Sequence, residues 1–395
     1  PLPGVPPAAQ GWVFASTDVA HERARQGSLE LRYASPVTDR VSWLAGLYHF
    51  SEDVDRDEDF VTRFSLMPAA GGNVSFLQDA GGSSQAVYGL VRAGLTTQLE
   101  LEAGLRYTHD HKSIHQVARN NDAADAVPGI PLFPGQPYDI RAGDTWNPLT
   151  GQLGLNYRPL PTMLVYGNVA RGFKAGAFPS QNNVVQNVAQ ATPAERVLST
   201  ELGVKAEWLE RRLRTNLAVF DTDAQDLQLF RLDPQLRLLT FTEDASIRGI
   251  ELDLAAIPLP GLQLGLTGSL LHARVDGGSN AGDALPRAPD AKFAARVQYG
   301  RAVAQGRAEL GLVYQWTDSF ETDVPNTRIM HVAGYHLIDA RLAWTDAAGN
   351  LEVAAWGRNL GDVDHVVHTI AFLGNGFSLY GAPRTYGLSV TYRIH

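Results

Sequence analysis

The segment HDHKSIH contains the first residues whose types could do chemistry. It supplies His109, His111 and His115, and the first two share a face if the chain is extended there. Because imidazole nitrogens bind transition metals and haem iron, metal or haem binding is one hypothesis for these residues. A solvated polar loop is the alternative, since the spacing is loose. The same two hypotheses apply to His365 and His368.

Basic and aromatic side chains form a second set of candidates, suited to an anionic or flat ligand. Cationic side chains attract anions, and aromatic rings can stack on a planar group. The candidates are Arg171, Lys174, Arg248, Arg296, Arg341 and Arg358, with Phe178, Phe372 and Phe377. Two alternatives stay open, because the cations can pair with Glu and Asp on neighbouring strands and the rings can serve loop packing.

Other kinds of chemistry find little support in these 395 residues. No HExxH, GxSxG, Walker or Rossmann element is present. The sequence has no cysteine for a thiolate site, a thiol nucleophile or a disulfide. A net charge of −9 with dispersed basic residues argues against a nucleic-acid partner. We therefore expect neither an enzyme nor a cofactor.

The stretch STELGVKAEWLERRLRTNLAVF, residues 199–220, shows which elements must position these candidates. Its residues are good helix formers, but a helix would leave Val204, Trp208 and Val219 opposite its apolar stripe. Two strands joined by a tight turn at 209–212 misplace almost nothing. The predicted hairpin puts Leu202, Val204, Trp208, Leu217 and Val219 on one face, and Glu201, Lys205, Arg212 and Arg214 on the other.

The same period of two continues along most of the chain, from about Ser28, in segments of about 9 to 14 residues. Short and long connections alternate between these segments. We expect short turns near 36–39, 96–98, 158–161, 209–212, 258–261, 300–306 and 346–349. We expect long polar loops at 52–82, 109–142, 175–195, 222–245, 273–288, 317–333 and 361–380.

Two unlike ends are typical of an up-and-down transmembrane β-barrel, which has short turns at one end and longer loops at the other. The segments are also long enough, since a tilted strand crosses a bilayer in about 9–11 residues. No run of about 18 apolar residues exists that could form a spanning helix. A soluble propeller is the alternative, but each blade needs three turns and only one per repeat is visible.

Five motifs in the chain resemble those of the TonB-dependent outer-membrane receptors. They occur in YGNVARGFKAGAF, TELGVKAEW, SIRGIELDL, WGRNLGD and the closing YGAPRTYGLSVTYRIH. The matching positions are Gly172, Phe173, Lys174 and Gly176; Glu201, Gly203 and Lys205; Arg248, Gly249, Ile250 and Glu251; Asn359, Leu360 and Asp362; Pro383, Arg384, Tyr386 and Gly387. Their order and spacing together make the resemblance specific.

The resemblance implies an all-β fold, a large antiparallel transmembrane barrel that has about 22 strands around a plugged lumen when complete. It covers roughly residues 28–395, where we count about 15 strands by the period-two pattern. Residues 1–27 are expected to be a loop or partial strand. No pattern of an N-terminal plug domain is visible, so we expect the chain to be the C-terminal part of such a barrel.

The resemblance also implies a function, which is uptake of a scarce ligand across the outer membrane of a Gram-negative bacterium. The ligand would most often be a ferric siderophore. The implied partners are TonB, the iron–siderophore complex, outer-membrane lipid and the barrel-assembly machinery. The basic candidates above would then line the lumen and the phenylalanines the outer loops. A passive porin or a surface-binding barrel without TonB coupling is the alternative.

Overall fold

A computed structural model describes residues 14–36, 40–64, 72–121, 137–179, 188–232, 238–372 and 375–394. Nearly all regular structure in these ranges is β-strand, and the predicted all-β class is confirmed. Short 3-10 helices occur at η4 (Gly278–Asn280) and η5 (Arg328–Met330). Within the described ranges no helix has the length and apolar character needed to cross a membrane.

The strands follow one another along the whole described chain. They are β1 (Phe14–Ala34), β2 (Val41–Phe64), β3 (Gly72–Gly94), β4 (Leu99–Asn120), β5 (Tyr138–Trp146), β6 (Leu149–Leu160), β7 (Met163–Lys174), β8 (Glu195–Trp208), β9 (Leu213–Leu232), β10 (Leu238–Leu259), β11 (Leu262–Val275), β12 (Ala291–Val303), β13 (Gly306–Thr317), β14 (Phe320–Glu321), β15 (His331–Val332), β16 (Tyr335–Asp346), β17 (Leu351–Arg358), β18 (Val366–Phe372), β19 (Asn375–Tyr380) and β20 (Thr385–Tyr392).

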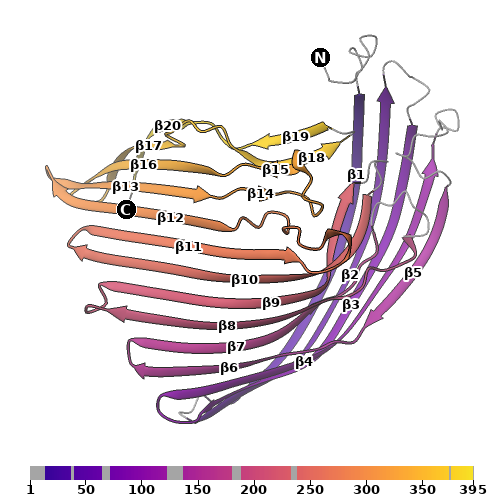
Figure 1. Ribbon diagram of the computed structural model, residues 1–395, viewed down its shortest axis with the longest axis horizontal. Coiled ribbons are helices and arrows are strands. Elements are labelled where there is room, and N and C mark those ends of the chain that lie inside the picture. Colours follow the sequence, from indigo (N-terminus) through magenta and orange to yellow (C-terminus); the bar gives the residue numbers. More distant parts are fainter. Residues whose placement is uncertain are drawn as a thin grey trace.

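Fifteen of these strands form one antiparallel path in chain order, as the sequence predicts. The path is β1-β2-β3-β4-β6-β7-β8-β9-β10-β11-β12-β13-β16-β17-β20, with β5 paired to β4 beyond β6. Figure 1 shows the path as a broad curved wall. Pairs β14–β15 and β18–β19 lie in the long connections. Among the described residues, β1 pairs only with β2 and β20 only with β17.

Residues 199–220 form the predicted hairpin and not a helix. Strands β8 and β9 pair from Trp208–Leu213 outward, and the turn is closed by the Arg212 N–H, which donates to the Leu209 carbonyl at 3.1 Å. Leu209, Glu210 and Arg211 adopt left-handed φ values of 53°, 55° and 66°. Left-handed residues suit a turn that must follow the twist of the two strands.

Six of the seven predicted short turns lie at one end of the wall, where each joins two neighbouring strands, and the turn at 36–39 falls largely outside the described residues. The prediction of long polar loops is partly wrong. The strand pairs β2–β3, β4–β5 and β9–β10 continue far into 52–82, 109–142 and 222–245, so β2 and β4 reach 24 and 22 residues. Continued pairing keeps backbone N–H and C=O groups bonded beyond the apolar segment. In contrast, the described residues 175–179 and 188–194 of the predicted loop 175–195 lie outside the strands.

Strand β1 starts at Phe14 and runs unbroken through residues 27 and 28, where we expected the first strand to begin. The apolar alternation of Leu29, Leu31 and Tyr33 stops there, and the same face continues as Arg25 and Arg23. Because the sequence signal was apolar periodicity, it ended where the face became polar, although the pairing with β2 continues to Phe64.

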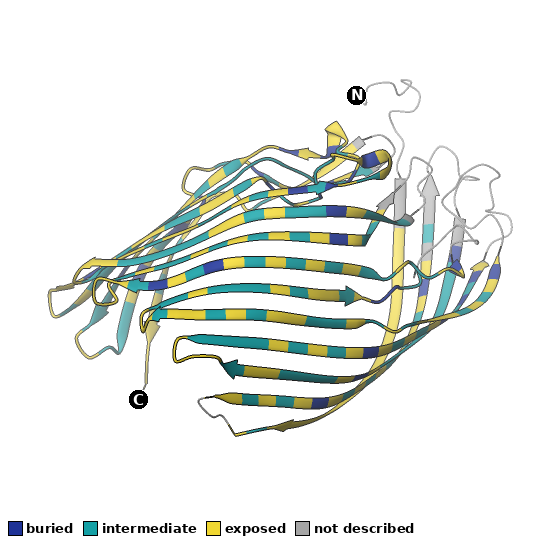
Figure 2. Cartoon of the chain, turned by 60° about the horizontal axis from the view of Figure 1, so that its bottom comes forward, coloured by how far each residue is buried: buried dark blue, intermediate teal, exposed yellow. Residues whose placement is uncertain are grey.

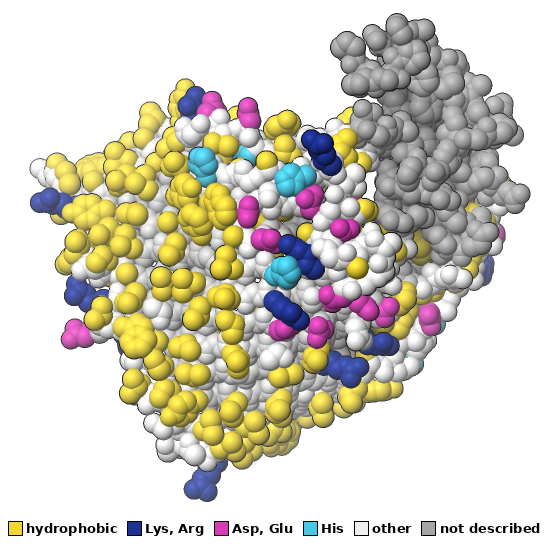
Figure 3. All heavy atoms as spheres, in the orientation of Figure 1, with side chains coloured by type: hydrophobic (Ala, Val, Ile, Leu, Met, Phe, Trp, Pro, Cys, Tyr) yellow, Lys and Arg dark blue, Asp and Glu magenta, His cyan; other side chains and the backbone are white. Residues whose placement is uncertain are grey.

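The wall has two faces of opposite character. We call the face that carries Leu202 and Trp208 the outer face and the one that carries Glu201 and Lys205 the inner face. Large apolar side chains on the outer face are exposed, as for Leu202 (59%) and Leu31 (66%). Figure 2 shows the alternation of exposed and half-buried residues along the strands, and Figure 3 shows hydrophobic side chains gathered over the outer face.

Buried apolar clusters lie at the long-loop end of the inner face. One joins Ala245, Ala273 and Val275 of the wall to Leu285 and Val324 of two loops. A second joins Ala118 and Tyr138 to Val188. Loops after β11 and β13 therefore fold inward and pack on the wall, where hydrophobic contact holds them.

Candidate ligand-binding wall

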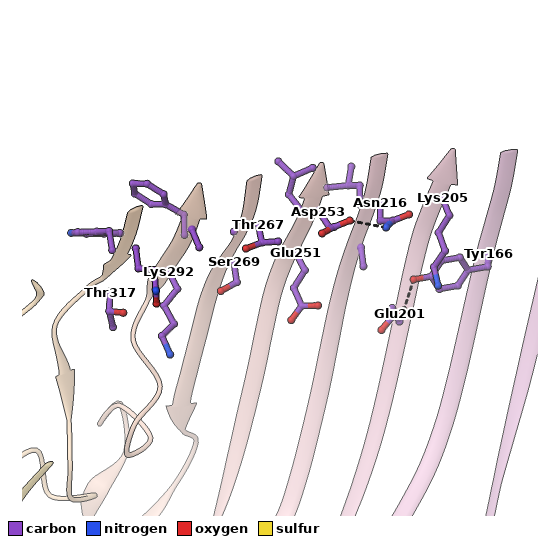
Figure 4. Close-up of a pocket in the computed structure, with 18 residues that line it drawn as sticks. Tyr166, Glu201, Lys205, Asn216, Glu251, Asp253, Thr267, Ser269, Lys292 and Thr317 are labelled. Atoms are coloured by element: carbon purple, nitrogen blue, oxygen red, sulfur yellow. Dashed lines mark hydrogen bonds between the residues drawn. The ribbon is translucent and has the colours of Figure 1, made fainter. Parts of the chain in front are cut away.

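The inner face holds a cavity of about 600 Å³, shown in Figure 4. Polar side chains from seven consecutive strands of the wall, β7 to β13, line it, and the labelled ones lie side by side on one face of the ribbon. They are Tyr166, Glu201, Lys205, Asn216, Glu251, Asp253, Thr267, Ser269, Lys292 and Thr317. The period of two brings these residues together, since each strand contributes every second side chain.

Tyr166 organises one side of this cavity. Its hydroxyl donates to Glu201 Oε1 at 2.6 Å, and Lys205 Nζ lies 5.3 Å from the ring centroid. The ring covers Gly203 so closely that a Cβ there would lie 2.4 Å from Tyr Cζ. Glu201, Gly203 and Lys205, which carry the Glu-x-Gly-x-Lys resemblance, thus form a hydrogen-bonded cradle for one aromatic ring.

The same arrangement recurs around the wall. Tyr88 covers Gly46 on the neighbouring strand, where a Cβ would lie 2.3 Å from the ring. The Tyr88 hydroxyl donates to Glu30 at 2.5 Å, and the Arg106 guanidinium lies 5.5 Å from the ring. Phe220 lies over Gly249 in the same way. Glycine is required at these positions because the aromatic ring occupies the space of its side chain.

A further ring lies over Gly387, another residue that carries the resemblance. Trp356 of β17 covers it, and a Cβ on Gly387 would lie 2.6 Å from the indole. The Arg358 guanidinium lies 5.8 Å from the same ring. This predicted ligand-binding cation therefore contacts the wall itself.

The Asn-Leu-x-Asp motif anchors the chain after β17. Asn359 is buried, has a left-handed φ of 48°, and donates to the carbonyls of Val363 and Ala382 at 3.0 and 3.1 Å. Asp362 accepts from the Arg384 guanidinium at 3.1 Å. Leu360 packs over Gly357, and Pro383 is exposed beside this ion pair.

The predicted basic candidates divide between the two faces. Lys174 and Arg341 lie on the inner face and pair with Glu195 at 3.5 Å and Glu352 at 2.6 Å, so the alternative of cross-strand pairing holds for both.

Arg171 and Arg248 do not line the lumen. They share the outer face with exposed Val169 and Ile250, two residues away on their own strands, and Arg248 pairs with Asp221 at 2.9 Å. The prediction that Arg171 and Arg248 line the lumen was wrong. Side chains alternate between the two faces of a strand, and each arginine is two residues from an outward-facing apolar side chain.

Lys292 and Arg296, on the same inner side of β12, have no ion pair with any described residue. Lys292 neighbours Ser269 across the ladder, and Ser269 in turn neighbours Glu251. Nearby, Asp253 accepts from Asn216 at 3.0 Å and lies 3.8 Å from Arg214. The cavity therefore offers hydroxyl donors and the cations Lys205 and Lys292, beside the carboxylates of Glu201, Glu251 and Asp253. Arg296 lines a neighbouring cavity on the same wall. Sequence reasoning named Arg296 but missed Lys292, although both have the parity of the charged side of β12.

The histidines His109, His111 and His115 lie in strand β4 and not in a loop. They share the outer face, where His109 and His111 contact Asn147 at 2.7 Å and Thr145 at 3.0 Å. His115 lies 2.9 Å from Asp139 and 3.3 Å from Asp79. No group of three or more metal-ligating side chains occurs in the described part of the chain. The metal hypothesis gains no support from this geometry.

The aromatic candidates lie at the long-loop end. Phe178 is half-buried after β7. Phe377 of β19 is 58% exposed and pairs across the small sheet with Ile370 of β18. Phe372 ends β18 opposite Asn375, and its side chain lies outside the described atoms. Phe173 of the Gly-Phe-Lys motif is half-buried on the outer face, and Gly172 beside it has open space where a Cβ would be.

Comparison with known proteins decides what this wall belongs to. A family model described as TonB dependent receptor-like, beta-barrel matches residues 9–360. The chain belongs to this family. Barrels of the family lie in the outer membrane of Gram-negative bacteria, so the apolar outer face contacts lipid and the inner face is the lumen wall. The family is one of receptors.

Individual relatives agree with the family. The chain is 25% identical over 209 residues to the pesticin receptor of Yersinia pestis, covering 52% of this chain and 28% of that protein. The ferric yersiniabactin uptake receptor FyuA of Yersinia pestis has a similar fold, with a TM-score of 0.80 at 20% identity. That match covers 95% of this chain and 55% of FyuA, so the chain spans about half of that receptor. The siderophore receptor PiuA of Acinetobacter baumannii matches with a TM-score of 0.63 at 14% identity, over 95% of this chain and 65% of PiuA.

Proposed function

We propose that this chain forms the lumen wall and outer loops of a receptor that takes up a ferric siderophore across the outer membrane. Family membership and the relatives named for ferric yersiniabactin and siderophore uptake support this proposal. TonB, acting through a plug outside the described residues, would release the ligand. The barrel-assembly machinery would insert the wall.

The inward-folded loops are the observation that carries the proposal against a passive pore. Leu285 and Val324, from the loops after β11 and β13, are 7% and 3% exposed because they pack on the inner face of β10 and β11. Asn326 joins the two loops, since its side-chain oxygen accepts from Ala284 N at 2.7 Å and its amide donates to the Ala284 carbonyl at 2.9 Å. A pore for free diffusion needs an open mouth, whereas a receptor needs ordered loops to select one ligand.

Lys292 and Arg296 supply the chemistry for an anionic iron chelate. Both have the inner-face parity of β12 and no ion pair among the described residues, so neither has to break an ion pair to bind ligand. A cation in a cleft concentrates anions and speeds their capture. Candidate contacts from the outer loops are Phe178, Phe372 and Phe377, whose rings suit a flat chelate. Lys174, Arg341 and Arg358 lie on the same lumen face as Lys292, with partners that limit their part in binding.

The test is uptake of radio-labelled ferric siderophores by cells that carry the full-length receptor as their only siderophore receptor. Accumulation that requires TonB supports the proposal. The double variant Lys292→Gln/Arg296→Gln should weaken uptake of anionic chelates by about tenfold for each charged contact removed. Arg341→Gln, whose cation is already paired, is the matched control. Diffusion of neutral solutes that follows size and ignores TonB would show a porin instead.

A further inference from the structure

The outer face changes from apolar to charged between two successive cross-strand rows. One row on β8–β11 is wholly apolar and exposed: Leu202, Val219, Ile250 and Leu270. The next row toward the long-loop end is polar: Thr200, Asp221, Arg248 and His272. Successive rows are two residues apart, which is about 7 Å along a strand. The change of character therefore locates the outer edge of the hydrocarbon layer to within about 7 Å on these strands. Figure 3 shows the charged side chains beside the hydrophobic ones.

Next to this boundary the ladder opens between β6 and β7. Their pairing ends at Gly151–Arg171, whereas β7 continues beside β8 to Lys174–Glu195. Strand β5 stays with β4, so nothing pairs with Gly172–Lys174 on that side among the described strands. The opening forms a cavity of about 300 Å³, which we call the fissure. Its lining includes Trp146, Leu149, Arg171, Phe173 and Arg196.

The two arginines of the fissure lie on the outside of the barrel. Trp146 has the inner-face parity of β5, and a Cβ on Gly176 would lie 2.5 Å from its indole. Arg171 shares the outer face with exposed Val169, and Arg196 shares it with exposed Leu198. A ligand travelling through the lumen therefore does not reach these two arginines.

Arg171 and Arg196 are cations without an ion pair among the described residues, and both are exposed. Other arginines of the same charged belt are neutralised. Arg248 pairs with Asp221 at 2.9 Å, and Arg274 pairs with Asp290 at 3.0 Å. Two free guanidinium groups thus meet in one cavity at the level where lipid headgroups begin.

We propose that the fissure binds a phosphate of an outer-leaflet lipid headgroup. Arg171 and Arg196 donate to the phosphate, because the guanidinium fork matches phosphate oxygens bidentately. Exposed Leu153 and Val169, which pair with each other one row from Arg171 toward the apolar band, contact the upper part of an acyl chain. The position at the edge of the apolar band favours a lipid over a dissolved anion. The inference does not depend on which ligand the receptor transports.

The test uses the full-length receptor purified from outer membranes, stripped of lipid and titrated with lipid A that carries both phosphates. Native mass spectrometry reports the bound fraction. Arg171→Gln/Arg196→Gln should weaken binding by about tenfold for each charged contact removed. Arg248→Gln, on the same belt but already paired, should bind as the wild type does. Heat-modifiable migration in gels confirms that each variant is folded.

The wild-type protein provides a second arm that needs no variant. Lipid A without phosphates should bind at least about tenfold more weakly, and an excess of inorganic phosphate should displace little lipid. Equal binding of the dephosphorylated lipid, or unchanged binding by the double variant, overturns the proposal. Complete displacement by inorganic phosphate also overturns it, because the fissure would then be a simple anion site. Uptake of siderophore is not measured in either arm, so failure here leaves the proposed function standing.

Discussion

Substituting Gly203 tests whether the Glu-x-Gly-x-Lys motif is a packing device. In Gly203→Ala the new Cβ would lie 2.4 Å from Tyr166 Cζ and 2.5 Å from its hydroxyl oxygen, distances too short for a non-bonded Cβ contact. The backbone of β8 is held by pairing on both sides, with β7 and β9. The ring must therefore move away from the wall.

The expected loss of stability follows from the contacts that the Tyr166 ring loses. Displacing it breaks the 2.6 Å hydrogen bond to Glu201, and a hydrogen bond to a charged group contributes about 1.5–3 kcal/mol. It also weakens the Lys205 contact at 5.3 Å, which contributes about 0.5–1 kcal/mol at an exposed site. The two losses share one ring and do not add fully. We expect the free energy of unfolding to fall by about 2–3 kcal/mol.

The assay is urea unfolding of the full-length receptor in lipid vesicles, followed by tryptophan fluorescence and gel migration. Gly172→Ala is the matched control. It lies in a motif strand next to β8, and a Cβ at this position would have no other atom within 4 Å, so its stability should change by less than about 1 kcal/mol. Tyr166→Ala combined with Gly203→Ala should cost less than the sum of the single variants. Equal midpoints for Gly203→Ala and Gly172→Ala would refute the cradle.

Two further predictions concern the loops. Asn359→Ala should destabilise the receptor by about 2–3 kcal/mol in the same unfolding assay, because it removes the hydrogen bonds to Val363 and Ala382 from a buried site. Arg384→Ala should cost less than about 1 kcal/mol, because its ion pair is half-exposed. Equal losses of stability in the two variants would contradict this prediction. Burial, with Arg287 nearby, lowers the pKa of His368 in β18 below its ordinary 6.5. His368 therefore takes up a proton more readily in the unfolded hairpin than in the folded one. The contribution of neutral His368 to the stability of the hairpin is complete above pH 6.5 and is lost as the pH falls below 6.5. Protection factors of the β18 and β19 amides, which are exchange rates normalised to the intrinsic rate at each pH, should therefore be lower at pH about 5 than at pH about 8, and His368→Gln should remove the difference.

The wall was predictable because each of its strands follows a simple rule. Where one face contacts lipid and the other water, apolar residues recur every second position, and a slip of one residue would exchange the faces. The hairpin of 199–220 shows the strength of this rule, since it overrode good helix propensity along the whole stretch. Short turns were equally predictable, because polar residues must interrupt the alternation where the chain reverses.

The outer ends of strands β1 and β4 were not predicted from the sequence, for the same reason in both. Beyond the lipid band the outer face becomes polar, as at Arg23 and Arg25 of β1 and His109 and His111 of β4, so strand pairing continues without an apolar signal. Residues near that edge were misplaced in turn. Arg171 and Arg248 were assigned to the lumen by charge, whereas parity with Val169 and Ile250 puts them outside.

The family resemblance identifies some residues of the candidate site and leaves others unidentified. Glu201, Gly203 and Gly249 make contacts within the wall, with Tyr166 and Phe220. Those contacts hold strands of the wall together, so the motifs carry information about the fold. Ligand choice must instead rest on groups left free by the wall, such as Lys292 and Arg296, and on loops that fold inward. Mutagenesis aimed at specificity should therefore begin with these residues and leave the motif positions intact.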